Sequence, residues 1–249
     1  MSSTGSALNV VISTSGMTLD DVIAVARDGA QVALSDESLA AMASTRLQID
    51  DLANAAEPVY GVSTGFGALA NRHIPAELRA QLQRSLIRSH AAGMGDPVER
   101  EVVRALILLR LKTLASGRTG VRPVVAETMA ALLNAGITPI VREFGSLGCS
   151  GDLAPLSHCA LVLMGEGEAV GPDGLARPVP ELLAAAGIEP IELHEKEGLA
   201  LINGTDGMLG MLILAIADLE HLCDVAEQEE RRWRGCGHAP SSLCNEGTL

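Results

Sequence analysis

Aromatic residues are scarce in this chain of 249 residues, which contains one Trp, one Tyr and two Phe and is only 2% aromatic. Hydrophobic residues nevertheless make up 47% of the chain, so its core must be built from aliphatic side chains. Strands are usually enriched in aromatic and β-branched residues. The composition therefore favours packed helices over sheets, and the length is ample for a buried core.

The chain also lacks the features of several other classes of protein. It has no basic run interleaved with aromatic residues, and 31 acidic against 18 basic residues give a net charge of −13, which argues against nucleic-acid binding. No basic segment followed by an apolar stretch begins the chain, so no signal peptide is expected. The most apolar stretch, residues 207–217, is far shorter than the ~20 residues of a membrane span, and no membrane association is expected.

The cysteines form neither a CxxC pair nor a pattern typical of a disulfide framework. The five cysteines are Cys149, Cys159, Cys223, Cys236 and Cys244. Their spacing also gives no support to a metal site. A protein of the reducing cytoplasm is therefore expected.

Local signals predict the starts of several helices. The sequence TLDD at residues 18–21 is a capping-box pattern, and Ser35 is placed to begin a second helix. Residues 96–99, DPVE, combine a cap, a proline at the first helical position and an acid in the first turn. They predict a third helix that ends at Gly117, and Pro123 predicts the start of a fourth. Apolar residues recur at helical spacing in each of these segments.

The fold class expected is mainly α, a helical bundle with glycine-rich loops and a small β-hairpin. Residues from 206 to about 225 are apolar on nearly all sides, which predicts a helix buried within the bundle. The sequence GPDG at residues 171–174 predicts the hairpin. We divide the chain into residues 1–226 and an atypical tail, residues 227–249, where the apolar periodicity is lost. The tail is either a disordered terminus or unrelated sequence that follows a truncation or frame change.

The run GSLGCSGDLAPLSH, residues 145–158, admits two interpretations. By residue types alone it is a tight turn before a helix, with Asp152 as the cap. A serine-hydrolase elbow is excluded, because that motif needs a Gly two positions before the Ser and another two positions after it. Two positions after Ser150 the chain has Asp152. The second interpretation is chemical, and it depends on the rest of the chain.

Together with two other glycine-rich segments, this run resembles the signature of the aromatic amino-acid ammonia-lyases and aminomutases. The resemblance covers roughly residues 8–225. It implies that Cys149, Ser150 and Gly151 form a methylidene-imidazolone ring, a protein-derived cofactor. The Gly151 nitrogen attacks the Cys149 carbonyl, which only glycine allows without a side-chain clash. Loss of two waters then leaves an electrophilic methylene derived from Ser150. Alanine is commoner than cysteine at the first position, but that residue contributes only its carbonyl.

Three further motifs carry the same resemblance and imply the roles of single residues. In YGVSTGFG, Tyr60 is implied as the base for the substrate β-proton, with Ser63 where the family often has asparagine. In LIRSHAAGMG, His90 is implied to lie beside a substrate imidazole, which favours histidine as substrate. In GLALINGTDGML, Asn203 is implied to hydrogen-bond the imidazolone oxygen or the substrate amine. A buried phenol, a helix-end cap and an Asn-Gly turn are the corresponding structural explanations.

The resemblance implies elimination of ammonia from L-histidine to give trans-urocanate, with no metal and no dissociable cofactor. It also implies a homo-oligomer, since the family's proteins assemble as tetramers. They are about twice as long as this chain, and their later half supplies a second catalytic tyrosine and an arginine for the substrate carboxylate. The chain by itself is therefore expected to be inactive or nearly so. The alternatives are a phenylalanine or tyrosine ammonia-lyase, an aminomutase, or a non-catalytic helical association module.

Overall fold

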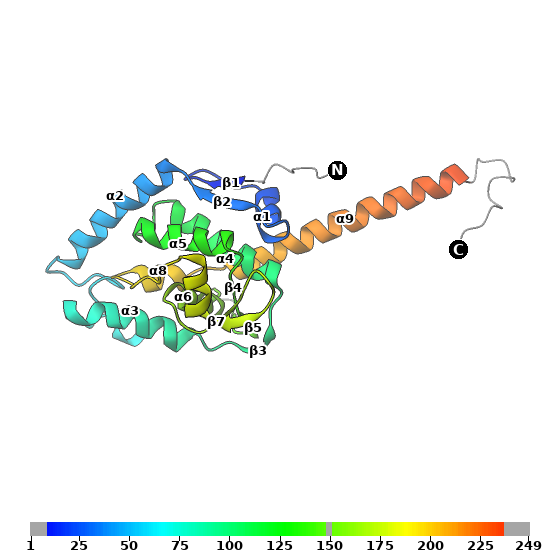
Figure 1. Cartoon of the computed structure of the whole chain (residues 1–249). Coiled ribbons are helices and arrows are strands. Elements are labelled where there is room, and N and C mark those ends of the chain that lie inside the picture. The colour runs from blue at the N-terminus through cyan, green and yellow to red at the C-terminus, as the bar shows by residue number, and fades with distance from the viewer. Residues whose placement is uncertain (1–8, 148–150, 237–249) are drawn as a thin grey trace. The chain divides into compact units, whose positions relative to one another are not determined.

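The computed structural model describes residues 9–147 and 151–236 and is mainly helical, as the composition predicts (Figure 1). Its internal contacts separate two units that divide between Met211 and Leu212. All of the described strands, and every described helix except most of the last one, belong to the first unit.

The elements of the described chain are short strands between longer helices. The helices are α1 (Leu19–Ala26), α2 (Asp36–Ala53), the 3-10 turn η1 (Gly67–Leu69), α3 (Ala76–His90), α4 (Arg100–Ala115), α5 (Pro123–Asn134), α6 (Leu153–Leu163), α7 (Val179–Ala186), α8 (Glu197–Ile202) and α9 (Asp206–Cys236). The strands are β1 (Asn9–Ile12), β2 (Gln31–Leu34), β3 (Met94–Pro97), β4 (Thr138–Pro139), β5 (Arg142–Phe144), β6 (Glu168–Val170) and β7 (Ala176–Pro178). β1 pairs with β2 in parallel, β3 with β5 antiparallel, and β4, β6 and β7 form an antiparallel sheet.

The core of the first unit is built around α4. This helix packs against α1, α2, α5 and α6, and its apolar side chains are buried on nearly every side. Leu108, Leu111 and Leu114 are fully enclosed, and the buried residues around them are almost all aliphatic. The expectation of an aliphatic core is confirmed.

One charged side chain, Arg104 of α4, lies inside this core. Its guanidinium donates to the carbonyl oxygens of Val25 (3.0 Å) and Leu133 (3.1 Å). Both oxygens lie in the last turn of a helix, α1 or α5, where the helix dipole is negative. Burial, followed by the charge of Arg100, lowers the pKa of Arg104 to about 10. Arg104 therefore ties three helices together through their backbones.

Where a cap is local in sequence, the predicted helix starts are confirmed. The hydroxyl of Thr18 accepts the Asp21 amide at 3.2 Å, and the Asp21 carboxylate accepts the Thr18 amide at 2.9 Å. This is a complete capping box ahead of α1. The hydroxyl of Ser35 accepts the Ser38 amide at 3.1 Å ahead of α2, and Pro123 is the first residue of α5.

The helix start predicted at residues 96–99 is wrong. Met94–Pro97 form β3, which pairs with β5, and the amide of Val98 donates to the carbonyl of Val141 at 2.9 Å. α4 begins only at Arg100. The backbone groups of this segment are used in pairing with a strand distant in sequence, which overrides the local helix signal.

The small hairpin is where the sequence predicts it. Residues 171–174 connect β6 to β7, and the amide of Gly174 donates to the carbonyl of Gly171 at 3.0 Å. Gly174 has a φ of +81°, a conformation that favours glycine. The turn therefore has a physical reason for its glycine.

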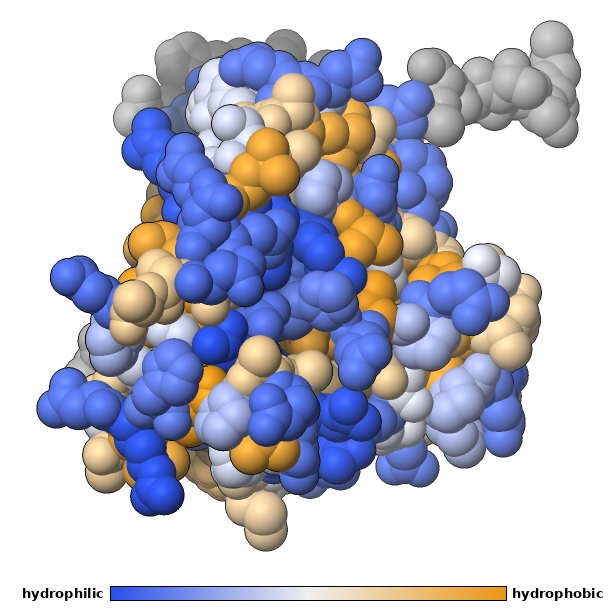
Figure 2. All heavy atoms as spheres, turned by 90° about the vertical axis from the view of Figure 1, so that its left-hand side faces the viewer, coloured by the Kyte–Doolittle hydropathy of each residue, from blue (hydrophilic) through white to orange (hydrophobic). Residues whose placement is uncertain are grey.

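A second group of helices, α3, α6 and α8, pack against one another and carry the candidate site (Figure 1). Glycine-rich segments lead into or out of each of them. The face seen in Figure 2 is mostly hydrophilic, with separate apolar patches among the polar side chains.

The last helix differs from its prediction in burial and in length. Gly207 and Gly210 in its first turns are buried, but Met208, Leu209 and Met211 are exposed. The expected burial on all sides is therefore met on one face only. α9 also continues without interruption through residues 227–236, so no break in the described helix marks the division at residue 226, which stays a prediction.

A longer apolar segment than residues 207–217 meets the length and composition of a membrane span. Residues 197–233 include an 18-residue window of mean hydropathy 1.7, long and apolar enough by length and composition to cross a membrane, and 44% of that window is buried in the protein. A buried core helix has the same composition. The absence of membrane association stays a prediction.

Candidate active site

Two adjoining pockets lie where α3, α6 and α8 meet. The first, of about 340 Å³, is lined by Tyr60, His90 and Asn203, three residues that the sequence motifs single out. The second, of about 620 Å³, is lined by Gly151 and by residues 143–147. His90 and Leu153 line both pockets. Four separate motifs therefore converge on one region of the surface.

Tyr60 is held in a loop by its own polar and aromatic neighbours. The amide of Val59 donates to the Ser63 hydroxyl at 2.9 Å, which closes a turn around Tyr60. The Phe66 ring meets the Tyr60 ring edge-to-face, with centroids 6.2 Å apart and an angle of 89°. Tyr60 is 50% exposed. The alternative structural explanation, a buried phenol, is therefore wrong, and Tyr60 lines the first pocket.

His90 is the last residue of α3. Its Nδ1 lies 2.9 Å from the carbonyl oxygen of Leu86 and 3.0 Å from the hydroxyl of Ser89. A carbonyl oxygen only accepts, so its bond with Nδ1 assigns the proton to that nitrogen. In the neutral ring Nε2 is then left as an acceptor, suited to an N–H donor.

Gly151 adopts a backbone conformation that only glycine tolerates. Its φ is +107°, and a Cβ placed there would lie 1.7 Å from the carbonyl oxygen of Gly204. The next amide, that of Asp152, donates to the same oxygen at 2.6 Å. α6 begins one residue later, at Leu153, so the predicted helix start near Asp152 is confirmed. The chain at residue 151 is therefore bent sharply against the loop that carries Asn203.

Asn203 ends α8 and is fixed through its backbone. Arg110 of α4 donates to the carbonyl oxygens of Ala200 and Asn203, both at 3.2 Å. The same guanidinium forms an ion pair with Asp206, the first residue of α9. The segment between α8 and α9 is thus held by one buried side chain, that of Arg110.

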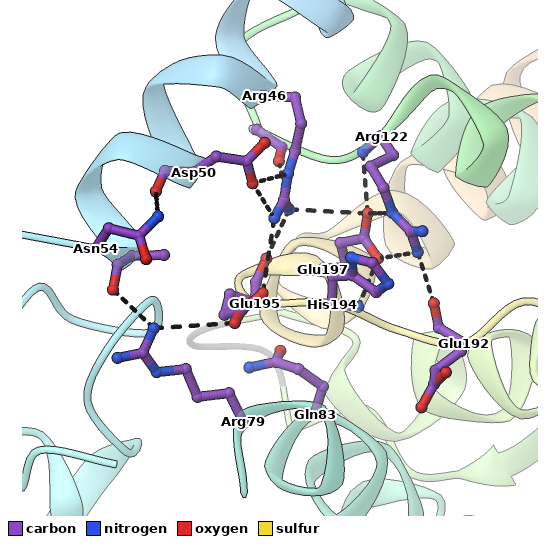
Figure 3. A network of polar contacts seen from close by, with 12 residues as sticks. Arg46, Asp50, Asn54, Arg79, Gln83, Arg122, Glu192, His194, Glu195 and Glu197 are labelled. Carbon is purple, nitrogen blue, oxygen red and sulfur yellow. Dashed lines mark hydrogen bonds and ion pairs between the residues drawn. The ribbon is translucent and has the colours of Figure 1, made fainter. Parts of the chain in front are cut away.

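The start of α8 is fixed by a buried carboxylate. Glu197 is 0% exposed and accepts hydrogen bonds from the Arg122 side chain at 2.8 and 2.9 Å (Figure 3). The amides of Arg122 and His194 also donate to it, at 3.0 and 2.8 Å. Burial alone would raise the pKa of Glu197, but these hydrogen bonds outweigh it and hold the pKa below the usual range.

Further side chains extend this network to α2 and α3 (Figure 3). Arg46 of α2 donates to the carbonyl of Glu195 at 2.9 Å, and Arg79 of α3 lies 3.9 Å from the Glu195 carboxylate. Gln83 of α3 accepts the amide of Gly198 at 2.9 Å. α8 is therefore anchored at its beginning by the network and at its end by Arg110, which fixes where Asn203 lies.

His158 of α6 supports the other side of the site. Its Nε2 accepts the amide of Gly93 at 3.1 Å, three residues beyond His90. Burial, followed by the charge of Arg142, lowers the pKa of His158. The neutral ring is the form that accepts this bond, so His158 in its neutral state holds the segment that follows His90.

The structure brings together Tyr60, His90, Gly151 and Asn203, but their chemical roles stay predictions. Cys149 and Ser150 lie outside the described residues. In the described part of the chain no group of three or more His, Cys, Asp or Glu side chains is placed to hold a metal ion. That the chemistry needs no metal also stays a prediction.

The supporting residues Arg110, Glu197 and His158 were not found from the sequence. One signal was available for Arg110. It is the one charge within the run LILLRL, residues 106–111 of α4, and such a charge is either buried and paired or faces solvent. For Glu197 and His158 nothing in the local sequence distinguishes them from surface residues.

A helical fold with glycine-rich loops that converge on two adjoining pockets is the arrangement that the resemblance implied, and comparison of the sequence agrees. Residues 17–228 match the aromatic amino acid lyase family. The chain belongs to this family. The match covers every element of the candidate site.

Relatives of established name fall within the same family. Histidine ammonia-lyase from Streptomyces griseus is 72% identical over 218 residues, and that from Streptomyces coelicolor is 70% identical, each match covering 88% of this chain. Among solved structures, tyrosine aminomutase from Streptomyces globisporus is 41% identical with a TM-score of 0.78, covering 84% of this chain and 39% of that one. Histidine ammonia-lyase from Trypanosoma cruzi is 36% identical with a TM-score of 0.77, covering 84% and 40%.

The chain spans less than half the length of the relatives it matches. The matched region is 42% of the Streptomyces griseus protein and 43% of the Streptomyces coelicolor protein.

Proposed function

We propose that this chain supplies one part of a histidine ammonia-lyase active site, which converts L-histidine to trans-urocanate and ammonia. The observation that carries the proposal is the pocket shared by Tyr60, His90 and Asn203, next to the bend at Gly151. The identity of 72% to a relative named for this activity supports the same assignment.

The residues around position 151 fit the protein-derived ring that the family resemblance implies. Gly151 has the positive φ of a sharply bent backbone, and no side chain would fit between it and Gly204. α6 begins directly after it and directs the positive end of its dipole toward this position. Formed from Cys149, Ser150 and Gly151, the ring would supply an electrophile to which the substrate can attach.

The described residues supply the binding and proton-transfer groups. Tyr60 is half exposed and lines the pocket, where its phenol oxygen is suited to take the substrate β-proton. His90, with Nε2 as an acceptor, is suited to receive the N–H of a substrate imidazole. The side-chain amide of Asn203 offers both a donor and an acceptor at the pocket wall.

A second candidate within the family is an aminomutase or a lyase acting on tyrosine or phenylalanine. It is favoured by the similarity to the tyrosine aminomutase structure. His90 argues against phenylalanine as the substrate, because an imidazole acceptor gives no advantage to an unsubstituted phenyl ring. Tyrosine has to be separated from histidine by measurement, because its hydroxyl can also donate a hydrogen bond. We also propose that the chain assembles with further copies of itself. We propose that it acts in the cytoplasm, since the cysteine pattern gives no sign of disulfides.

The test of the proposed chemistry is mass spectrometry of the tryptic peptide that contains residues 149–151. Ring formation removes two water molecules from this peptide, and the Ser150→Ala variant cannot lose the second one. We expect the doubly dehydrated peptide in the unsubstituted chain only. An intact serine in the unsubstituted chain would contradict the proposal and would favour a non-catalytic association module.

The test of substrate class measures the binding of L-histidine, L-phenylalanine and L-tyrosine to the chain by ligand-detected NMR. We expect L-histidine to bind best and His90→Phe to remove that preference. His73→Phe is the matched control, because His73 is exposed and does not line either pocket. Stronger binding of L-tyrosine by the unsubstituted chain would favour the aminomutase.

A further inference from the structure

Two arginines of α4 are buried within six positions of each other, and they act on different parts of the fold. Arg104 is 2% exposed and ties α1 and α5 to α4. Arg110 is 3% exposed and reaches the segment between α8 and α9 instead. Only the second of them therefore contacts the chain that forms the candidate site.

Arg110 lies directly against Gly204. A Cβ placed on Gly204 would lie 1.4 Å from Nη2 of Arg110, so only glycine fits between the guanidinium and the loop. On its other side the carbonyl oxygen of Gly204 accepts the amide of Asp152 at 2.6 Å. The same oxygen occupies the space that a Cβ of Gly151 would need. Gly204 thus lies between Arg110 and Gly151 and contacts both, and neither contact leaves room for a side chain on the glycine.

The guanidinium is suited to this position by its shape and charge. Nη1 donates to two carbonyl oxygens at the negative end of α8, while Nη2 pairs with Asp206 at the start of α9. A planar fork can satisfy both directions at once, whereas a lysine ammonium offers one point of charge. The position of Gly204 is therefore determined by groups on three helices.

We propose that Arg110 is a positioning residue for formation of the ring, because it holds Gly204 against Gly151, whose nitrogen must form the new bond to the Cys149 carbonyl carbon. This inference rests on the proposed function. Ring closure forms the bond from that nitrogen to that carbon. The carbonyl oxygen leaves as water with the amide hydrogens of residues 150 and 151, and the Ser150 hydroxyl leaves as a second water with the α-hydrogen. No oxidant or reductant is needed.

The experiment compares Arg110→Met with Arg104→Met, two equal truncations of buried arginines on one helix. The chain is produced by cell-free synthesis, and the rate at which the peptide containing residues 149–151 of the newly made chain loses two waters is followed by mass spectrometry. We expect Arg110→Met to slow this loss by about 10²-fold, the order of effect that a small misplacement of reacting groups produces. Arg104→Met should leave the rate in the folded fraction unchanged, and Arg110→Lys should recover part of it.

A second measurement does not depend on ring formation. The amide of Asp152 is protected by Gly204, so hydrogen exchange of residues 151–153 should accelerate in Arg110→Met and not in Arg104→Met. Equal dehydration rates and equal exchange in the two variants would overturn the inference. An intact serine in the unsubstituted chain would instead overturn the proposed function, and the exchange measurement would still decide whether Arg110 holds this segment.

Discussion

The carboxylate of Asp152 accepts the amide of Gly207 at 2.7 Å, which joins the starts of two helices that are distant in sequence. It also accepts the amide of Met208 at 3.1 Å. Asp152 stands at the N-cap position of α6, yet its side chain caps α9. The backbone amide of the same residue donates to Gly204. Asp152 therefore joins the start of α6 to the start of α9 through its side chain and to Gly204 through its backbone.

Removing this carboxylate should destabilise the chain. Asp152→Ala leaves the amides of Gly207 and Met208 without their acceptor, and we expect a loss of about 1–3 kcal/mol in the free energy of unfolding, as for buried donors left unpaired. Urea unfolding measures the change. Asp173→Ala is the control, because Asp173 forms a surface ion pair with Arg177 worth about 0–1 kcal/mol. Equal losses in the two variants would contradict the inferred role of Asp152.

Replacing the buried carboxylate of α8 should have a larger effect, and that effect should depend on pH. Glu197→Gln removes the charge that Arg122 faces, and we expect a loss of about 3 kcal/mol at pH 7, at the low end for a buried pair because Arg122 is partly exposed. The pKa of Glu197 is held below its usual value of 4.5. Its contribution is therefore fully present above pH 4.5 and is lost as the pH falls through the folded-state pKa.

The measurement is urea unfolding of both proteins at pH 7 and at a series of values below 4.5. The stability difference between them should shrink as the pH falls. Glu192→Gln is the matched control, since the Glu192 side chain is 67% exposed and forms a surface ion pair with Arg84. A difference that stays constant with pH would show that the pKa of Glu197 is the same in the folded and the unfolded chain, which would contradict the inferred pairing.

The parts of the fold that were predicted correctly depend on residues close in sequence. Thr18, Ser35 and Pro123 signal helix starts because the groups they satisfy lie within one turn. The hairpin at residues 171–174 is predicted for the same reason. The helix start at residues 96–99 failed because its backbone pairs with β5, which no local pattern reveals.

For the site, the sequence located the residues that line the pockets but not those that hold them. Tyr60, His90 and Asn203 stand in glycine-rich motifs, where the need for close backbone approach limits the residue types. Arg110 and Glu197 stand in ordinary helical sequence. Their roles depend on burial and on partners 75 to 96 positions away, which are set only when the helices pack.

Protonation of His158 should weaken the fold at mildly acidic pH. Its folded-state pKa is lowered below 6.5, so the unfolded chain binds a proton first as the pH falls. The contribution of His158 is therefore present above pH 6.5 and declines below it. His158→Gln, which keeps an acceptor for the Gly93 amide, should remove this part of the pH dependence.

Urea unfolding from about pH 7.5 to about pH 5, a range that includes the ordinary histidine pKa, would measure how the stability of both proteins changes with pH. His73→Gln is the control, because His73 is an exposed histidine outside the site. It should keep the slope of the unsubstituted chain. An unchanged slope in His158→Gln would show that this ring does not hold the segment after His90 in its neutral form.

The last helix carries an exposed apolar stripe at the spacing of a coiled-coil seam. The residues Leu212, Ala215, Leu219, Leu222 and Ala226 recur at alternating intervals of three and four, and all are exposed. Apolar residues at this spacing are the contact positions of paired helices. We expect the chain to self-associate through this stripe.

Substitution within the stripe should weaken the association. Leu222→Glu places a charge where an apolar contact is expected, whereas His221→Glu adds the same side chain one position away and off the stripe. Loss of a buried leucine contact is worth about 1.5–3 kcal/mol, so the dissociation constant should rise at least about tenfold in Leu222→Glu. Sedimentation over a range of concentrations measures it. Equal dissociation constants for the two variants, or a monomer at every concentration, would show that the stripe does not join copies of this chain.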